Sequence, residues 1–64
     1  MQISREKINI AMARKKMTVV KLSEVYGASR ARITIILNSR EVSPAVAGRL
    51  ADALGVDVTE ILED

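Results

Sequence analysis

The chain has 64 residues and a net charge of +2, and 48% of its residues are hydrophobic. A chain of this length forms one domain at most and buries only a small core. Neither cysteine nor histidine occurs, so disulfides and zinc sites of the His/Cys kind are excluded, and we predict no cofactor. Nothing resembles a signal peptide, and no apolar run approaches the roughly 20 residues of a membrane span. We therefore expect a cytoplasmic protein with no membrane partner.

One pattern recurs five times: a Ser, Thr or Asp that can cap a helix, an apolar residue just before it and another four positions after it. The caps are Ser4, Thr18, Ser29, Ser43 and Asp57. No convincing stretch alternates with period two, so the sequence predicts an all-α fold without a sheet. The five expected helices span residues 5–15, 19–26, 30–38, 44–54 and 58–63.

The apolar faces of these helices predict the core. Its expected members are Ile8, Ala11, Met12, Leu22, Val25, Tyr26, Ile33, Ile36, Leu37, Ala47, Leu50, Ala51, Leu54, Ile61 and Leu62, with Met17 and Val56 added from the helix starts. Val46 lies at the edge of its apolar face and is expected to be half exposed. Only one aromatic residue occurs, so this core is mainly aliphatic.

Residues 19–38 meet the demands of two helices packed closely across a short turn, a helix-turn-helix. Ser23 is small enough to let the second helix approach, and Gly27 is the residue that most readily takes the left-handed conformation that the turn requires. The required apolar positions hold Leu22, Tyr26, Ala28, Ile33 and Ile36.

Charge is divided unevenly along the chain. Residues 1–40 hold nine basic and two acidic side chains, a net charge of +7. Residues 41–64 hold one basic and six acidic side chains, a net charge of −5. This asymmetry indicates one side that faces a polyanion and another that is turned away from it. Together with the helix-turn-helix pattern, it favours binding to double-stranded DNA over a chance distribution of solvated charges.

The chain resembles the Cro/C1-type helix-turn-helix family, the compact, lambda repressor-like five-helix DNA-binding domain of phage repressors and many small bacterial regulators. The resemblance is clearest in MTVVKLSEVYGASRARITIILNSR and VSPAVAGRLADALGVDVTEIL. It implies that residues 1–64 form a single DNA-binding domain of a small transcriptional regulator or repressor, nucleoid-associated when bound. Residues 30–38 would enter the major groove, and a homodimer would bind a palindromic operator.

Three positions depart from the family pattern. Val19 stands where a phosphate-binding Gln is common, which puts one phosphate contact in doubt. Lys16 precedes Met17 where a Gly is common, and Ser39 follows Asn38 where a Gly is common. Each of these two positions requires either a non-glycine residue in a tight turn or a different turn.

The face of residues 30–38 opposite the core is expected to contact DNA. The family implies base contacts at Arg30, Ala31, Thr34 and Ile35. Arg30 can bind guanine through two hydrogen bonds, and the apolar groups of the other three suit thymine methyls. For Ile35, three alternatives stay open: a methyl contact, a protein contact or a core residue. The predicted phosphate contacts are Thr18, Lys21, Ser29, Arg32, Asn38 and Arg40.

Two other functions compete with DNA binding. A protein-interaction module on the same scaffold, antitoxin-like or an accessory factor, would use Val19, Val20 and Ile35 as an apolar contact patch. An enzyme is the weakest alternative, because His and Cys are absent and no acid pair is obviously placed in a pocket. We expect no enzymatic activity. The acidic C-terminal half is the expected self-contact surface of a homodimer, because its charge disfavours DNA.

Overall fold

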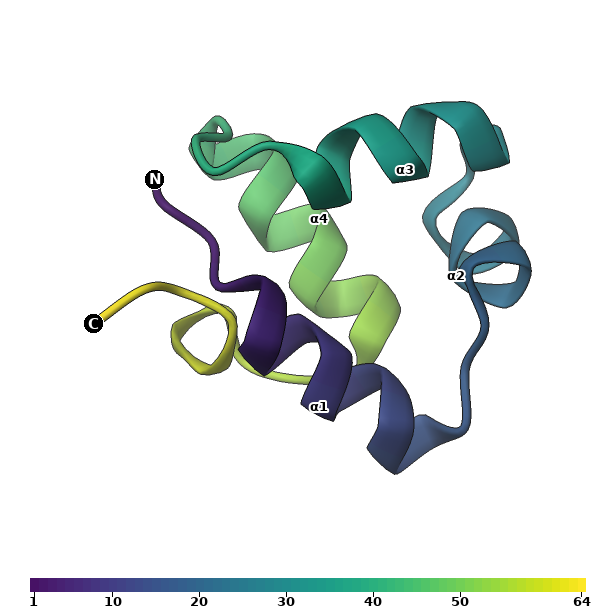
Figure 1. Ribbon diagram of the computed structural model, residues 1–64, viewed down its shortest axis with the longest axis horizontal. Coiled ribbons are helices and arrows are strands. Elements are labelled where there is room, and N and C mark those ends of the chain that lie inside the picture. Colours follow the sequence, from purple (N-terminus) through teal and green to yellow (C-terminus); the bar gives the residue numbers. More distant parts are fainter.

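The computed structural model describes all 64 residues and contains four α-helices and one short 3-10 helix (Figure 1). Their bounds are α1 Arg5–Lys15, α2 Val19–Tyr26, α3 Arg30–Asn38, α4 Pro44–Leu54 and η1 Val58–Glu60. The first four bounds coincide with the predicted ranges. The architecture is all-helical, as expected. No helix is long enough and apolar enough to cross a membrane.

All five predicted caps are confirmed. Four hydroxyl caps each accept a hydrogen bond from the backbone N–H three residues later, at 3.1 to 3.2 Å; they are Ser4, Thr18, Ser29 and Ser43. The carboxylate of Asp57 accepts hydrogen bonds from the hydroxyl and the backbone N–H of Thr59, which together hold the Asp57 pKa below its ordinary value of 3.8. These bonds satisfy N–H groups that the start of a helix leaves without partners.

The prediction of a fifth α-helix over residues 58–63 is wrong. The chain makes one 3-10 turn, and the backbone N–H of Ile61 donates to the carbonyl of Val58 at 3.1 Å. Beyond that turn the backbone runs beside the N-terminal segment. Ser4 N–H donates to the Ile61 carbonyl at 2.8 Å, and Ile3 forms an isolated antiparallel bridge with Leu62. Bonds to the N-terminal segment thus replace those that would continue the helix.

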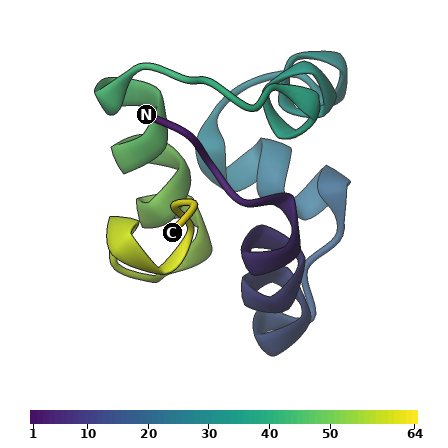
Figure 2. The same cartoon turned by 60° about the vertical axis from the view of Figure 1, so that its left-hand side comes forward.

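The N-terminal segment also pairs with the loop between α3 and α4. Ile3 N–H donates to the Arg40 carbonyl at 3.0 Å, and Gln2 forms an isolated antiparallel bridge with Glu41. Residues 1–4 therefore lie between the α3–α4 loop and the C-terminal segment without forming a strand (Figure 2). This pairing fixes the start of α1 close to the end of α3.

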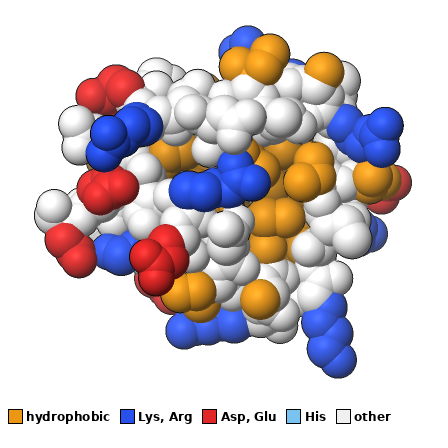
Figure 3. All heavy atoms as spheres, viewed as in Figure 1, with side chains coloured by type: hydrophobic (Ala, Val, Ile, Leu, Met, Phe, Trp, Pro, Cys, Tyr) orange, Lys and Arg blue, Asp and Glu red, His pale blue; other side chains and the backbone are white.

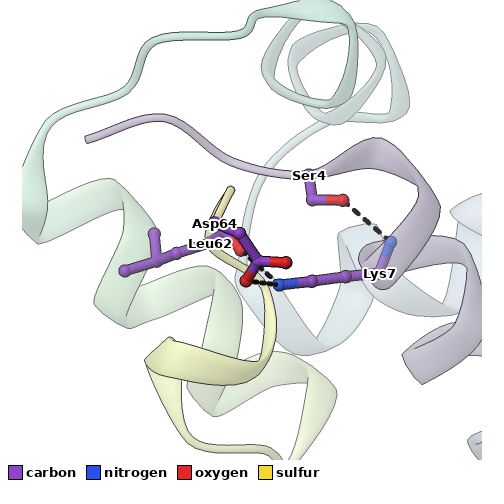
Figure 4. A network of polar contacts seen from close by, with 4 residues as sticks. All are labelled: Ser4, Lys7, Leu62 and Asp64. Carbon is purple, nitrogen blue, oxygen red and sulfur yellow. Dashed lines mark hydrogen bonds and ion pairs between the residues drawn. The ribbon is translucent and has the colours of Figure 1, made fainter.

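A side-chain contact from α1 holds the C-terminal end in place (Figure 4). The ammonium group of Lys7 donates to the carbonyl of Leu62 at 2.9 Å and to the carboxylate of Asp64 at 2.7 Å. The hydrogen bond from Lys7, and then its charge, hold the pKa of Asp64 below its ordinary value of 3.8. The last residues of the chain are thus attached to α1 as well as to residues 1–4.

The core contains most of the predicted residues. Those confirmed as buried are Ile8, Ala11, Met12, Leu22, Tyr26, Ile33, Ile36, Leu37, Ala47, Leu50, Ala51, Leu54 and Ile61. Met17, Val46, Val56 and Leu62 are half-buried against this core. Val25 contradicts the prediction, since it is 50% exposed, and Ile3 is buried although the helical pattern did not include it.

The error at Val25 follows from the way α2 packs. The inward face of α2 consists of Leu22, Ser23 and Tyr26. The small side chain of Ser23 permits close packing, and its hydroxyl donates to the Val20 carbonyl at 2.7 Å, so it is buried without an unpaired polar group. With Ser23 turned inward, Val25 lies at the outer edge of the helix.

The two positions that lack the common glycine behave differently. Lys16 ends α1 in the left-handed conformation, with φ 54°, which is unusual for a residue with a side chain. Ser39 ends α3 in an extended conformation, with φ −85° and ψ 136°. The first position thus keeps the tight turn without glycine, and the second uses a different turn.

Candidate functional site

Helix α3 lies along one edge of the molecule, between α2 and the loop that leads to α4 (Figure 1). The turn that joins α2 to α3 depends on Gly27, which has φ 88°. The backbone N–H groups of Gly27 and Ala28 both donate to the Ser23 carbonyl, at 2.9 and 3.1 Å. Ile33, Ile36 and Leu37 bury the inner face of α3. This packing fixes which side chains α3 presents outward.

The four side chains predicted to contact bases are all exposed: Arg30, Ala31, Thr34 and Ile35. The Thr34 hydroxyl donates to the Arg30 carbonyl at 2.9 Å, so its proton is used within the helix. Its methyl group and its acceptor lone pairs remain for an outside partner. Ile35 is 59% exposed, which rules out the alternative that it belongs to the core.

Helix α3 separates two shallow depressions. The depression on the α2 side is lined by Thr18, Val19, Val20, Arg30, Ala31 and Thr34. The depression on the α4 side is lined by Arg32, Ile35, Ile36, Ser39, Glu41, Val42, Ser43 and Val46. Val20 and Ile35, two members of the apolar contact patch considered above, therefore line different depressions. The exposed part of α3 forms a ridge between them.

Two helix N-termini lie next to this ridge. The cap of α2, Thr18, lines the depression on the α2 side together with the first residues of α3. The cap of α3 is Ser29, which is also exposed. The positive end of a helix dipole and its free N–H groups favour an anion such as phosphate.

Three exposed arginines near α3 have guanidinium groups without a hydrogen bond or ion pair inside the chain; they are Arg30, Arg32 and Arg40. The ammonium of Lys21 lies 4.0 Å from the Glu24 carboxylate, an exposed pair that adds little stability. On the face shown in Figure 3, acidic side chains gather on the side of the molecule that carries the two chain ends. The cations beside α3 are thus available to an outside anion.

All the predicted phosphate contacts are exposed, and they lie at the starts of α2 and α3, within these two helices and just beyond the end of α3: Thr18, Lys21, Ser29, Arg32, Asn38 and Arg40. The side-chain oxygen of Asn38 accepts a hydrogen bond from another helix, because Arg5 of α1 donates to it at 3.2 Å. Arg5 is not among the residues that the sequence predicted to contact DNA. The two residues are separated by 33 positions in sequence, so no local pattern could have revealed their contact.

A comparison with family models identifies this arrangement. Residues 7–64 match the model of the Cro/C1-type HTH DNA-binding domain. Comparisons with curated proteins and with solved structures gave no significant match. The matched range includes all of α2, α3, α4 and η1, and therefore every predicted contact residue.

Proposed function

Because the chain belongs to the Cro/C1-type helix-turn-helix DNA-binding family, we propose that it binds double-stranded DNA sequence-specifically and regulates transcription. Residues 1–64 act as one DNA-binding domain in this proposal. Helix α3 enters the major groove, and α2 lies across the backbone beside it.

The observation that supports this proposal best is the outer face of α3. It combines the unpaired guanidinium of Arg30 with the apolar groups of Ala31, Thr34 and Ile35. A guanidinium can bind O6 and N7 of guanine together, and apolar groups can contact thymine methyls. Ile35 is the most exposed of the large hydrophobic side chains of the protein, at 59%.

The proposed phosphate contacts surround that face. Lys21, Arg32 and Arg40 supply positive charge, and Thr18 and Ser29 place helix N-termini close to the backbone. These contacts set the orientation of α3 without reading sequence. The division between base and phosphate contacts can be tested one residue at a time.

A single copy offers one recognition helix, whose few base contacts give modest specificity. We therefore propose that two copies bind a palindromic operator, with half-sites about one helical turn apart. We place the self-contact surface of the dimer in residues 41–64, because their net charge of −5 turns this part of the chain away from DNA.

A salt titration of duplex binding tests the proposal. Affinity for a pool of labelled duplexes is measured at salt concentrations from roughly 50 to 200 mM, where a protein that neutralises several phosphates loses affinity steeply. A linear fall of the logarithm of affinity with the logarithm of salt supports DNA binding. Absence of binding even at the lowest salt contradicts it and favours a protein-interaction module.

A further inference from the structure

Arg5, the first residue of α1, connects that helix to the end of α3. Its Nε donates to Oδ1 of Asn9 at 3.1 Å, and its Nη1 donates to Oδ1 of Asn38 at 3.2 Å. All three side chains are exposed. The contact is possible because residues 1–3 pair with the α3–α4 loop, which brings the start of α1 to the end of α3.

These two hydrogen bonds determine how both amides are oriented. Arginine has five N–H donors and no acceptor, so an amide beside it must present oxygen and not nitrogen. The Nδ2 groups of Asn9 and Asn38 are therefore left as free donors beside Arg5, since neither makes a hydrogen bond within the chain. Arg5 itself keeps three N–H groups that no residue of the chain uses.

The result is a cluster of free hydrogen-bond donors around one positive charge. The side chain of Arg40, two residues after Asn38, has no partner within the chain and adds a second positive charge just beyond the end of α3. Glu6, the acidic neighbour of Arg5 in sequence, lines a different hollow together with Lys7 and Asp64. The donors are thus not occupied by that carboxylate.

We propose that Arg5, Asn9 and Asn38 form a composite site for one phosphodiester group of the DNA backbone. The site is separate from the N-termini of α2 and α3, and it makes α1 a third DNA-contacting helix. The guanidinium supplies the charge, and the amides supply neutral donors that its own hydrogen bonds orient. The inference rests on the proposed DNA binding, because a duplex bound along α3 is what brings a phosphate to this end of the helix.

A purely structural role for Arg5 makes a different prediction. A cation near the C-terminal end of α3 would stabilise that helix through its dipole. Removing the cation would then lower the stability of the free protein and leave the salt dependence of DNA binding unchanged. The salt dependence of DNA binding therefore distinguishes a phosphate contact from a purely structural role.

The test uses the full chain with Arg5→Gln, Arg5→Lys and the matched control Arg14→Gln. Arg14 is an exposed arginine near the other end of α1, and its guanidinium lies 3.6 Å from Glu60. For a duplex that the unsubstituted chain binds, we expect Arg5→Gln to weaken binding about 3- to 10-fold. We also expect it to reduce the salt slope, the steepness with which the logarithm of affinity falls with the logarithm of salt concentration, by about one unit. Arg14→Gln should leave the slope unchanged.

Arg5→Lys should restore the salt slope but only part of the affinity, since an ammonium keeps the charge and loses the planar fork that orients the amides. Adding Asn38→Ala to Arg5→Gln should cost less than Asn38→Ala alone, because Arg5 orients that amide. An unchanged salt slope for Arg5→Gln, in a chain that binds DNA, overturns the inference and leaves the proposed function intact. If the unsubstituted chain binds no duplex, the proposed function is wrong, and the inference that rests on it is wrong as well.

Discussion

The guanidinium of Arg49 lies over the ring of Tyr26, with 4.4 Å between its central carbon and the ring centroid. The Nε of the same arginine donates to the backbone carbonyl of Tyr26 at 3.1 Å. Arg49 thus attaches α4 to the last residue of α2, immediately before the Gly27 turn. It is also the only basic residue among residues 41–64, and its guanidinium lies beside Gly27 of this turn.

Arg49→Ala should lower the free energy of unfolding by about 1–2 kcal/mol. The loss combines one hydrogen bond from a charged donor with one cation–π contact at a partly exposed site. Urea denaturation measures it, and Arg14→Ala is the matched control, since its exposed 3.6 Å pair with Glu60 is worth little. Equal losses in both variants would show that the Tyr26 contacts add nothing.

Lys16→Gly should raise the stability of the protein by about 0.5–1 kcal/mol. Lys16 has φ 54°, a conformation that costs a side-chain-bearing residue energy and that glycine adopts freely. Lys15→Gly, one position earlier and inside α1, is the control and should destabilise the protein. A loss of stability in the Lys16 variant, measured by thermal or urea unfolding, would contradict the account of this turn.

Arg30→Ala should weaken binding to a preferred duplex by about 1–3 kcal/mol and relax the preference at one base pair. The reason is that a bidentate contact to guanine is lost while the phosphate contacts remain. Binding to a set of duplexes that differ at single positions measures the effect, with Arg32→Ala as the comparison. If Arg30→Ala weakened binding to every duplex equally, Arg30 would be a phosphate contact.

Lys21→Ala should weaken binding to all duplexes similarly and reduce the salt slope by about one unit, because one phosphate contact is lost. Lys15→Ala removes the same charge from the end of α1 and should leave the slope unchanged. Titrations over a range of salt concentrations compare the two variants. A slope for Lys21→Ala equal to that of the unsubstituted chain would remove Lys21 from the interface.

The parts of the fold that the sequence predicted are those encoded locally. A hydroxyl or carboxylate at each helix start, such as Ser29 or Asp57, satisfies N–H groups in its own helix, so its effect is visible within a few residues. The same holds for Gly27, whose left-handed conformation is required by the turn it occupies. The bounds of four helices could therefore be derived without knowledge of the packing.

The failures arose where contacts between distant segments decide the structure. The expected fifth helix stops at Glu60 because Ile61 and Leu62 pair with residues 3 and 4. Val25 is exposed because α2 packs with Ser23 facing inward, and this orientation is set by the helices that surround α2. In the candidate site, the predicted residues are all exposed, whereas the contact between Arg5 and Asn38 depends on the path of the N-terminal segment.

Selection of bound duplexes from a random pool, followed by sequencing, tests the central claim most directly. Sequence-specific binding by two copies predicts an enriched palindromic motif with half-sites about one helical turn apart. It also predicts that Arg30→Ala changes the motif at one base pair in each half-site. A pool that remains random after repeated selection would contradict sequence-specific binding through α3.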